Sequence, residues 1–297
     1  MLEYIYPTVS ILESEGIKIP SFLNDKETNV DSKTVQSFGE EWEKFNQFTS
    51  DELNRIGDDY FDLATMLHPE MIALDVGCGS GRWAQYIITK LKFIEAIDPS
   101  NAVYVAAANL HKFGNIRVTQ ASVNHLPFSD NSFDFVYSLG VLHHVPNTIE
   151  AIKNCFTKTK PGGWFLVYLY YNLDNRGIIF HALFALSAYL RRIISACPPS
   201  IKHFLCELIA AVVYWPLAKL SHLVSFFSER LARTIPLSYY RKTSFFIMRN
   251  DALDRFGTPL EKRFSKIEIT DMLAQAGFVN IRFSSKEPFW HAIAQKP

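Results

Sequence analysis

The chain has 297 residues, 48% of them hydrophobic and 20% charged, so it can bury a full core and is not a disordered polymer. Thirty Lys and Arg balance thirty Asp and Glu, which excludes a net field that attracts nucleic acid to the whole chain. The four cysteines form no Cys-x-x-Cys pair, which argues against a zinc ribbon or a disulfide scaffold and favours a reducing, cytosolic compartment. The first residues lack the basic region and apolar run of a secretion signal.

Residues 1–68 are predicted to form an N-terminal arm with a capping helix. Residues 1–37 have weak periodicity and contain Pro7 and Pro20, which indicates an arm with little regular structure. Over residues 51–67, apolar side chains recur every three or four positions, as on one face of a helix that Pro69 ends.

Residues 69–175 alternate between short apolar runs and helical patterns. Helices are expected over 83–91, 102–110 and 148–157, and strands over 72–76, 93–97, 116–119, 133–137 and 164–170. Such alternation predicts a parallel sheet with helices on both faces.

Residues 176–250 break this alternation and are predicted to form a helical insert. They contain no clear strand, and ten Lys and Arg against two Glu give a formal charge of +8, which the neutral total hides. Uncharged runs cover residues 177–190 and 208–218. Because both runs are shorter than the ~18–20 residues of a membrane-spanning helix, we expect no span.

Residues 251–297 return to the α/β pattern. Ser265 and Glu268 form a Ser-x-x-Glu capping box at the start of a helix that Gly277 ends. Two further strands, over 279–284 and 289–294, are expected to pair antiparallel and to complete the sheet.

A glycine-rich turn follows the first strand of the core. Gly77 and Gly79 lead to Gly81, whereas a dinucleotide-binding turn carries its third glycine one position later, where this chain has Arg82. The carboxylate of Asp75, two residues before the turn, repels a diphosphate and suits a cationic group. The turn therefore disfavours a nicotinamide dinucleotide.

A second acidic residue, Asp98, ends the second strand of the core. An acid at this position accepts hydrogen bonds from ribose hydroxyls. The implied ligand has a ribose, no phosphate and a positive charge. S-adenosylmethionine fits this description, and NAD does not.

Six segments resemble, in order and spacing, the motifs of class I S-adenosylmethionine-dependent methyltransferases, in particular a small-molecule, methyltransferase type 11-like branch. They are LDVGCGSGR at 74–82, AIDPS at 96–100, QASVNHLPF at 120–128, SFDFV at 132–136, LHH at 142–144 and KPGG at 160–163. The resemblance implies a Rossmann-like α/β fold with a doubly wound, seven-stranded mixed sheet in the order 3-2-1-4-5-7-6, interrupted here by the helical insert.

The resemblance also implies which residues bind S-adenosylmethionine: Asp75, Gly77, Cys78, Gly79, Gly81, Asp98, Pro99, Ser122, Val123, Leu139 and Trp42. The glycine turn would hold the amino-acid end and Asp98 the ribose. Ser122, where relatives often have Asp, and Val123 would face the adenine, and Leu139 would lie beneath the sulfonium. Trp42, with Phe45, would cap the cofactor from the arm.

His143 and His144 follow the fourth core strand at its carboxyl end, where open α/β sheets bind ligands. Imidazole titrates near neutral pH, so either ring is a candidate general base for a hydroxyl or amine acceptor, and a structural role for the pair is the alternative. Residues 138–141 lack the Asn/Asp-Pro-Pro-aromatic segment of enzymes that methylate nucleic-acid amines, and no carboxylate cluster indicates a metal. We therefore expect neither nucleic acid nor a metal.

The sequence predicts a cytoplasmic enzyme that transfers a methyl group from S-adenosylmethionine to a small molecule. The first choice of acceptor is a hydroxyl of an apolar, anionic or lipid- or carrier-linked metabolite. Three roles stay open for residues 176–250: a lid over an apolar pocket, peripheral contact with a membrane, or a homodimer interface. Two other functions stay open as well: a noncatalytic S-adenosylmethionine-binding or membrane-surface protein on the same fold and, less favoured, a nicotinamide-dependent oxidoreductase.

Overall fold

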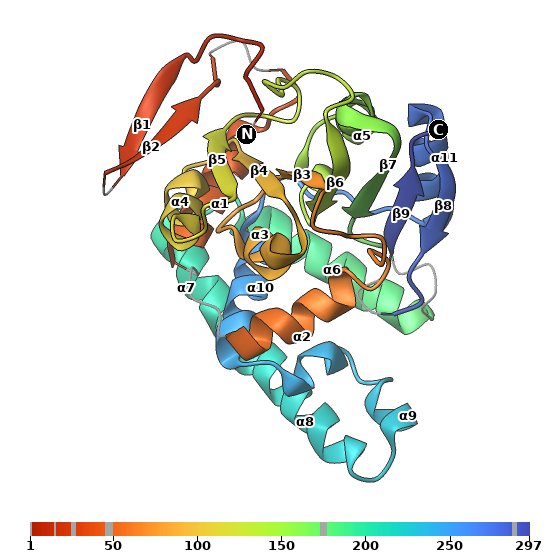
Figure 1. The fold of residues 1–297 in the computed structure, drawn as a ribbon. Helices are drawn as coiled ribbons and strands as arrows, with labels where there is room; N and C mark the ends of the chain where they lie inside the picture. The colour runs from red at the N-terminus through yellow and green to blue at the C-terminus, as the bar shows by residue number, and fades with distance from the viewer. Residues whose placement is uncertain (1, 15, 25–27, 45–49, 173–176, 287–289) are drawn as a thin grey trace. The chain divides into compact units, whose positions relative to one another are not determined.

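The computed structural model describes residues 2–14, 16–24, 28–44, 50–172, 177–286 and 290–297. The chain divides into two compact units, one formed by Met1–Asn172 with Leu260–Pro297 and the other by Leu173–Pro259. The first unit holds the sheet, and the second consists of helices (Figure 1). The predicted insert, residues 176–250, lies inside the second unit, whose bounds are wider at both ends.

The strands of the first unit are β1 (Ser10–Ser14), β2 (Ile17–Ser21), β3 (Ile72–Val76), β4 (Phe93–Asp98), β5 (Ile116–Gln120), β6 (Phe133–Leu139), β7 (Thr159–Tyr168), β8 (Val279–Phe283) and β9 (His291–Gln295). They form one sheet in the order β1-β2-β5-β4-β3-β6-β7-β9-β8 (Figure 1). Strands β3 to β7 are parallel, and β9 is antiparallel to both β7 and β8. From β5 to β8 the order is the expected 3-2-1-4-5-7-6, which confirms the doubly wound α/β fold with a mixed sheet.

The helices of the first unit are α1 (Ser32–Lys44), α2 (Ser50–Tyr60), α3 (Arg82–Ile87), α4 (Ala102–Leu110), α5 (Thr148–Lys158) and α11 (Lys266–Ala276), with short 3-10 turns η1 (Ile88–Lys90) and η2 (Leu142–His144). Helices α5 and α11 pack over one face of the sheet, in a core that includes Leu74 and Val136. Since side chains alternate along a strand, Tyr137 points to the other face. There the ring of Phe61, just after α2, lies 5.6 Å from Tyr137 and 6.1 Å from Trp83 of α3.

The N-terminal arm is more regular than predicted, and the expected count of seven strands is corrected to nine within the part of the chain that the structure describes. Strands β1 and β2 form an antiparallel hairpin, and β2 joins β5 through one parallel pair, Ser21 with Gln120. Ile19 of β2 is fully buried against Val103 of α4. Pro20 is tolerated in β2 because this strand pairs with β5 only at Ser21. Proline lacks the backbone N–H that a complete ladder of hydrogen bonds would need.

The helix predicted over residues 51–67 also differs from the structure, because α2 ends at Tyr60. The apolar side chains beyond it pack from turns rather than from a helix face, since Phe61 and Ala64 are both buried. Periodicity alone does not separate these two ways of burying the same residues.

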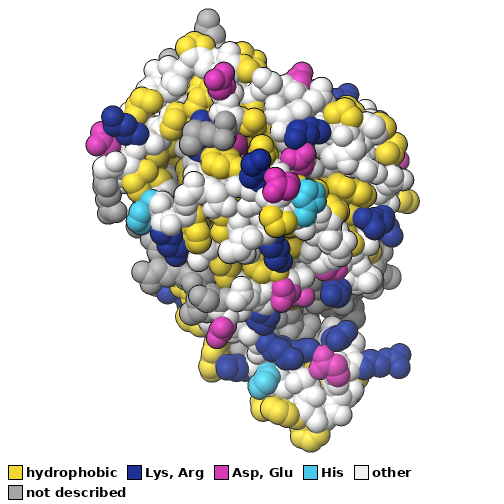
Figure 2. Space-filling model, viewed as in Figure 1, with side chains coloured by type: hydrophobic (Ala, Val, Ile, Leu, Met, Phe, Trp, Pro, Cys, Tyr) yellow, Lys and Arg dark blue, Asp and Glu magenta, His cyan; other side chains and the backbone are white. Residues whose placement is uncertain are grey.

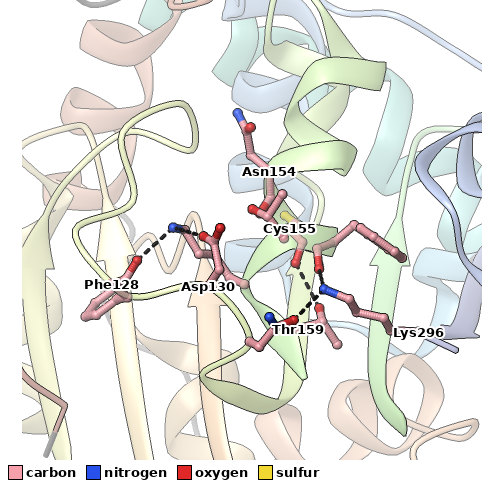
Figure 3. A network of polar contacts seen from close by, with 10 residues as sticks. Phe128, Asp130, Asn154, Cys155, Thr159 and Lys296 are labelled. Atoms are coloured by element: carbon pink, nitrogen blue, oxygen red, sulfur yellow. Dashed lines mark hydrogen bonds and ion pairs between the residues drawn. The ribbon is translucent and has the colours of Figure 1, made fainter. Parts of the chain in front are cut away.

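A polar network fixes the junction between α5 and β7 at the amino ends of the parallel strands (Figure 3). Lys158 donates to the carbonyl oxygen of Phe128 and to the Asp130 carboxylate, both at 2.7 Å, and Thr159 Oγ1 donates to the Cys155 carbonyl at 2.8 Å. Lys296 approaches from the C-terminus and donates to the Phe156 carbonyl at 2.8 Å. The amino edge of the sheet is therefore closed by structural contacts, which leaves the carboxyl edge as the candidate site.

The second unit contains helices α6 (Ile178–Ile194), α7 (Pro199–Ile209), α8 (Trp215–Ser225), α9 (Glu229–Ala232) and α10 (Phe245–Gly257), with the π-helical turn η3 (Ala210–Tyr214) and the 3-10 turn η4 (Ser238–Lys242). Helix α10 packs against α6, α7 and η3, and α8 packs against α9 and η4. This unit has a small core of its own.

Among the described residues, Pro199–Ser225 is one helical stretch of 27 residues, and an 18-residue window of it has a mean hydropathy of 1.5, so by length and composition alone it is able to cross a membrane. The expectation of no span is based on the length of the two uncharged runs, and it stays a prediction. This stretch is longer than the uncharged run 208–218 because η3 joins α7 to α8 without a break, so the helix continues past Glu207 and Lys219.

Candidate active site

The glycine turn connects β3 to α3 at the carboxyl edge of the sheet. Gly77, Gly79 and Gly81 all have positive φ, at 80°, 53° and 80°, a region that residues with a Cβ rarely occupy. The backbone N–H groups of Gly77 and Cys78 donate to the Ile97 carbonyl at 2.8 and 2.9 Å. The turn is thus tied to the end of β4, as the strand–turn–helix prediction requires.

Close neighbours explain why no side chain fits in this turn. A Cβ at Gly77 would lie 2.4 Å from Val141 Cγ1, and one at Gly79 would lie 2.9 Å from the indole of Trp42. Trp42 belongs to α1, and the Arg82 guanidinium stacks over its ring at 4.8 Å. The arm therefore brings Trp42 against the glycine turn, where the sequence placed it. Phe45 lies outside the described residues.

Asp98, at the end of β4, is the acceptor that organises the turn. Its Oδ2 accepts from the Gly79 N–H at 3.0 Å, and its Oδ1 accepts from the N–H and the hydroxyl of Ser100 at 2.8 and 2.6 Å. Burial raises the pKa of this carboxyl, and the bonds from Ser100 and Gly79 oppose that rise. Because a carboxylate offers about four acceptor positions, Asp98 keeps roughly one for a ligand hydroxyl.

Asp75, on β3, is a buried carboxyl beside the turn. Burial raises its pKa to about 8, opposed by the Tyr137 hydroxyl and reinforced by the negative charge of Asp98. Without a cation nearby, Asp75 is therefore largely protonated at neutral pH. Burial, with Asp98 and Asp75 adding to it, also raises the pKa of the Cys78 thiol well above its usual value. Cys78 is thus a protonated thiol and not a nucleophile.

The segment predicted to face adenine follows β5, and Ser122 and Val123 are both buried there. The Ala121 N–H donates to the Asp98 carbonyl at 3.2 Å, so this segment is fixed to the end of β4 next to Pro99. Leu139 is the last residue of β6, at the same carboxyl edge. The structure brings these residues to one edge of the sheet, and their contacts with a cofactor stay predictions.

His143 and His144 lie in η2 at this edge, and both rings are buried. The His143 ring stacks on Tyr170 with centroids 3.9 Å apart, and neither of its nitrogens has a hydrogen-bond partner among the described residues. Burial, together with the nearby His144 and Arg263, lowers the pKa of His143 well below its usual value. His143 is therefore a neutral ring and a weak base in this structure.

The second histidine of the pair has a structural contact. His144 donates through Nδ1 to the Leu260 carbonyl at 2.6 Å, and Phe38 of α1 lies edge-on to its ring at 4.7 Å. These contacts hold the loop after β6 against the segment that returns from the second unit. The role of either histidine as a general base stays a prediction.

Sequence reasoning missed a group formed by Asp62, Ser284 and His291. His291 Nε2 donates to Asp62 Oδ1 at 2.8 Å, and Ser284 Oγ donates to Asp62 Oδ2 at 2.6 Å. His291 begins β9 and pairs with Tyr168, the last residue of β7, which pairs in turn with Leu139. Three neighbouring strands therefore place Leu139, Tyr168 and His291 side by side on one face at the carboxyl edge.

No motif marks this group in the sequence, because Asp62 and His291 are more than 200 residues apart. The aromatic ring of Tyr60 lies 5.2 Å from Tyr168 and 6.3 Å from His291. At this edge, aromatic rings therefore pack around one buried imidazole that a carboxylate holds. Within the described ranges, no group of three or more His, Cys, Asp or Glu lies close enough to hold a metal ion.

The charges of the buried carboxyls beside the glycine turn indicate which cofactor fits there. Two carboxyls, Asp75 and Asp98, lie at the glycine turn, and Asp98 already occupies the Gly79 N–H that a phosphate would need. A diphosphate would be repelled by the Asp98 carboxylate and would find no cation there, whereas a nucleoside with a cationic amino-acid end would favour the ionised form of Asp75 and meet complementary charge. The residues present fit S-adenosylmethionine.

Comparison with known proteins agrees with this geometry. Residues 74–167 match the family described as a methyltransferase domain. This stretch is a class I S-adenosylmethionine-dependent methyltransferase domain. The chain is 34% identical over 103 residues to demethylmenaquinone methyltransferase of Geobacillus kaustophilus, a match over 31% of this chain and 42% of that protein.

Two further curated methyltransferases are similar. Phosphoethanolamine N-methyltransferase 2 of Caenorhabditis elegans is 32% identical over 106 residues, covering 34% of this chain and 24% of that one. Ubiquinone biosynthesis O-methyltransferase of Neisseria meningitidis is 28% identical over 151 residues, covering 48% and 63%. The chain thus spans less than two thirds of the length of each of these relatives.

Among solved structures, a SAM-dependent methyltransferase from Aquifex aeolicus is similar with a TM-score of 0.43 and 15% identity, over 84% of this chain and 98% of that one.

Proposed function

We propose that this protein is an enzyme that transfers the methyl group of S-adenosylmethionine to a hydroxyl of a small, apolar or anionic acceptor. The observation that carries the proposal is the pair of buried carboxyls, Asp75 and Asp98, at a glycine turn inside a methyltransferase domain. The bound cofactor would supply a methyl carbon activated by its sulfonium. Everything else in the reaction is binding, orientation and proton removal by the chain.

Binding would use the two carboxyls differently. Asp98 would accept one ribose hydroxyl with its remaining acceptor position, while its bond to Gly79 keeps the turn in place. Asp75 would lose its proton when the cationic amino-acid end arrives, because a neighbouring positive charge favours the carboxylate. Trp42 would restrict access of water to the turn from the side of α1.

A hydroxyl acceptor requires removal of its proton, and the Asp62–His291 pair supports this step better than His143. His291 lies at the same edge of the sheet, and its Nε2 donates to Asp62 Oδ1 at 2.8 Å. The carboxylate fixes the ring and stabilises the imidazolium that forms. The lowered pKa of His143 makes that ring a poorer proton acceptor.

The name of one relative, ubiquinone biosynthesis O-methyltransferase, favours a hydroxyl as the acceptor group, and the name of another, demethylmenaquinone methyltransferase, favours a quinone-like molecule. The rings of Tyr60, Tyr168 and Tyr170 supply apolar faces at the edge where such an acceptor would stack. We therefore propose phenolic or quinol-like molecules with an apolar tail as the first acceptors to test.

The experiment combines calorimetry with radiolabelled methyl transfer. The protein should bind S-adenosylmethionine and not NADH, and it should label at least one hydroxylated aromatic acceptor in a panel that also contains amines and RNA. His291→Ala should lower kcat by roughly 10²–10⁴-fold with cofactor affinity unchanged, whereas His143→Gln should lower it much less. Binding of NADH would overturn the proposal, and cofactor binding without transfer to any acceptor would favour a noncatalytic binding protein.

A further inference from the structure

The second unit carries an unusual amount of exposed apolar surface on its outer helical faces. On α6 the exposed apolar residues follow a spacing of three and four, which places them in one stripe: Leu183, Leu186, Leu190 and Ile193. In the described part of α6, this apolar stripe is exposed to solvent, whereas a surface helix normally exposes a polar face.

The long helical stretch from α7 to α8 has two different faces. Its inner face packs against α10 and η4 through small or polar buried side chains, among them Cys206, Ala210 and Ala218. Its outer face is apolar and exposed, at Ile201, Phe204, Leu208, Val212, Trp215, Leu220 and Leu223. The face turned away from the helical core is therefore the more hydrophobic one.

The apolar surface ends in a pair of phenylalanines at the turn between α8 and α9. Phe226 is 73% exposed and Phe227 is 91% exposed, and Leu223 and Leu231 beside them are each 60% exposed. In Figure 2, hydrophobic side chains lie at the foot of the lobe that contains α8 and α9, with Lys and Arg side chains just above them. Exposing two phenylalanine side chains to water at a tip is unfavourable in free energy, and such side chains are suited to insertion into an apolar layer.

The charge of the same unit is positive and poorly neutralised. Residues 173–259 contain eleven Lys and Arg against five Asp and Glu, a formal charge of +6. Glu229 is already engaged by Arg233 and Arg241. Three exposed basic residues of this unit have no acidic partner among the described residues: Lys219, Arg230 and Lys242.

We propose that this surface, defined by Leu223, Phe226, Phe227 and Leu231 with Lys219, Arg230 and Lys242 around them, docks the protein on an anionic lipid bilayer. The phenylalanines enter the region between headgroups and acyl chains, and the basic side chains meet the lipid phosphates. Charge complementarity selects this occupant, because a second copy of the chain would bring the same positive charge against it.

The contacts of the inner face favour docking on the membrane over crossing it. The Glu207 carboxylate accepts from Arg249 of α10 at 2.7 Å, and Lys202 is buried in the same layer close to Gly257. A helix that left this layer to span a bilayer would carry Lys202, Glu207 and Lys219 into hydrocarbon and would break the core of the unit. This inference does not rest on the proposed methyl transfer.

The test is co-sedimentation of the full-length protein with vesicles, followed by extraction of the pellet. We expect binding to phosphatidylserine–phosphatidylcholine vesicles at low salt, little binding to pure phosphatidylcholine, and release by high salt or alkaline carbonate. The double variant Phe226→Ser, Phe227→Ser should lower partitioning at least about tenfold. The triple variant Lys219→Gln, Arg230→Gln, Lys242→Gln should lower it on the order of 100-fold, at about fivefold per charge.

Matched controls come from the first unit. Ile267→Ser removes an exposed apolar side chain of α11, 73% exposed, and should leave partitioning unchanged. Lys90→Gln, Lys112→Gln, Lys153→Gln removes the same number of exposed charges and should reduce partitioning far less than the tip variant.

Several results would overturn the proposal. They are absence of folded protein from the anionic vesicle pellet at low salt, equal losses in the tip and control variants, and a pellet that resists alkaline carbonate, which would indicate a span. Sedimentation velocity gives a further result of this kind. If the wild-type protein is a dimer that does not bind vesicles, and the Phe226→Ser, Phe227→Ser variant is a monomer, the surface would be assigned to a second copy of the chain.

Discussion

Replacing Asp98 with Ala separates the role of this residue in cofactor binding from its role in the glycine turn. The carboxylate accepts three bonds within the protein, from the Gly79 N–H and from the N–H and hydroxyl of Ser100. About one acceptor position remains for a ribose hydroxyl, so binding loses one charge-assisted hydrogen bond. That bond is worth about 1.5–3 kcal/mol, which corresponds to a roughly 10- to 150-fold rise in the Kd for S-adenosylmethionine.

The same substitution also lowers stability without cofactor. It leaves the buried Gly79 N–H without an acceptor, at a cost of about 1–3 kcal/mol. Calorimetric titration with S-adenosylmethionine, run beside thermal unfolding of the ligand-free protein, measures the two effects separately.

Asp134→Ala is the matched control for this prediction. Asp134 also accepts a backbone N–H, that of Ile72 at 2.9 Å, and it pairs with Lys160 at 2.7 Å, but it lies at the amino end of β3. It should reduce stability to a similar degree and leave the Kd unchanged. A folded Asp98→Ala protein with the wild-type Kd, or an equal rise in Kd in the Asp134 variant, would refute the assignment of Asp98 to the ribose.

Four more outcomes are expected. Gly77→Ala should destabilise the fold by about 2–5 kcal/mol in urea unfolding, because it adds strain at positive φ and a Cβ 2.4 Å from Val141, whereas Gly114→Ala, with open space, should have little effect. The folded-state pKa of Asp75, about 8, is above its unfolded value, so its contribution to stability is full at low pH and is lost as the pH rises toward 8; Asp75→Asn should flatten this part of the pH profile in thermal unfolding. For the same reason, binding of the cationic cofactor should release a proton between pH 6 and 8, seen as a buffer-dependent heat in calorimetry, and equal heats in all buffers would contradict it. Ser265→Ala should cost about 1 kcal/mol in urea unfolding, because it removes the hydroxyl that accepts from the Glu268 N–H, and an unchanged midpoint would show that the cap is not needed.

Local patterns were sufficient for the sheet and the turn. Strand β3 and helix α4 have the bounds that the sequence predicts, because a short apolar run between turn residues and an alanine-rich helical run each carry their own signal. The glycine turn was equally readable, since three positive φ values require glycine whatever surrounds them. Ser265 and Glu268 form the predicted capping box.

The predictions that differ from the structure concern segments whose structure depends on distant partners. The N-terminal hairpin is held by burial of Ile19 against α4, a contact that no local pattern announces. Helix α2 ends early because Phe61 and Ala64 are buried from turns. The long helix of the second unit continues through a π-helical turn, a feature with no sequence signal of its own.

The sequence by itself determined the core strands, the glycine turn and the two acids beside it, because each is specified within a few consecutive residues. The order of the strands was implied only by the resemblance to methyltransferases. Only the tertiary structure decided what surrounds these elements. It placed Trp42 on Gly79 and buried His143 under Tyr170. It also brought Asp62 into hydrogen-bond contact with His291, which lies 229 residues later in the sequence. The physical reason is that backbone conformation follows from local sterics and hydrogen bonding, whereas the neighbours and protonation of a side chain depend on which distant segments exclude water around it.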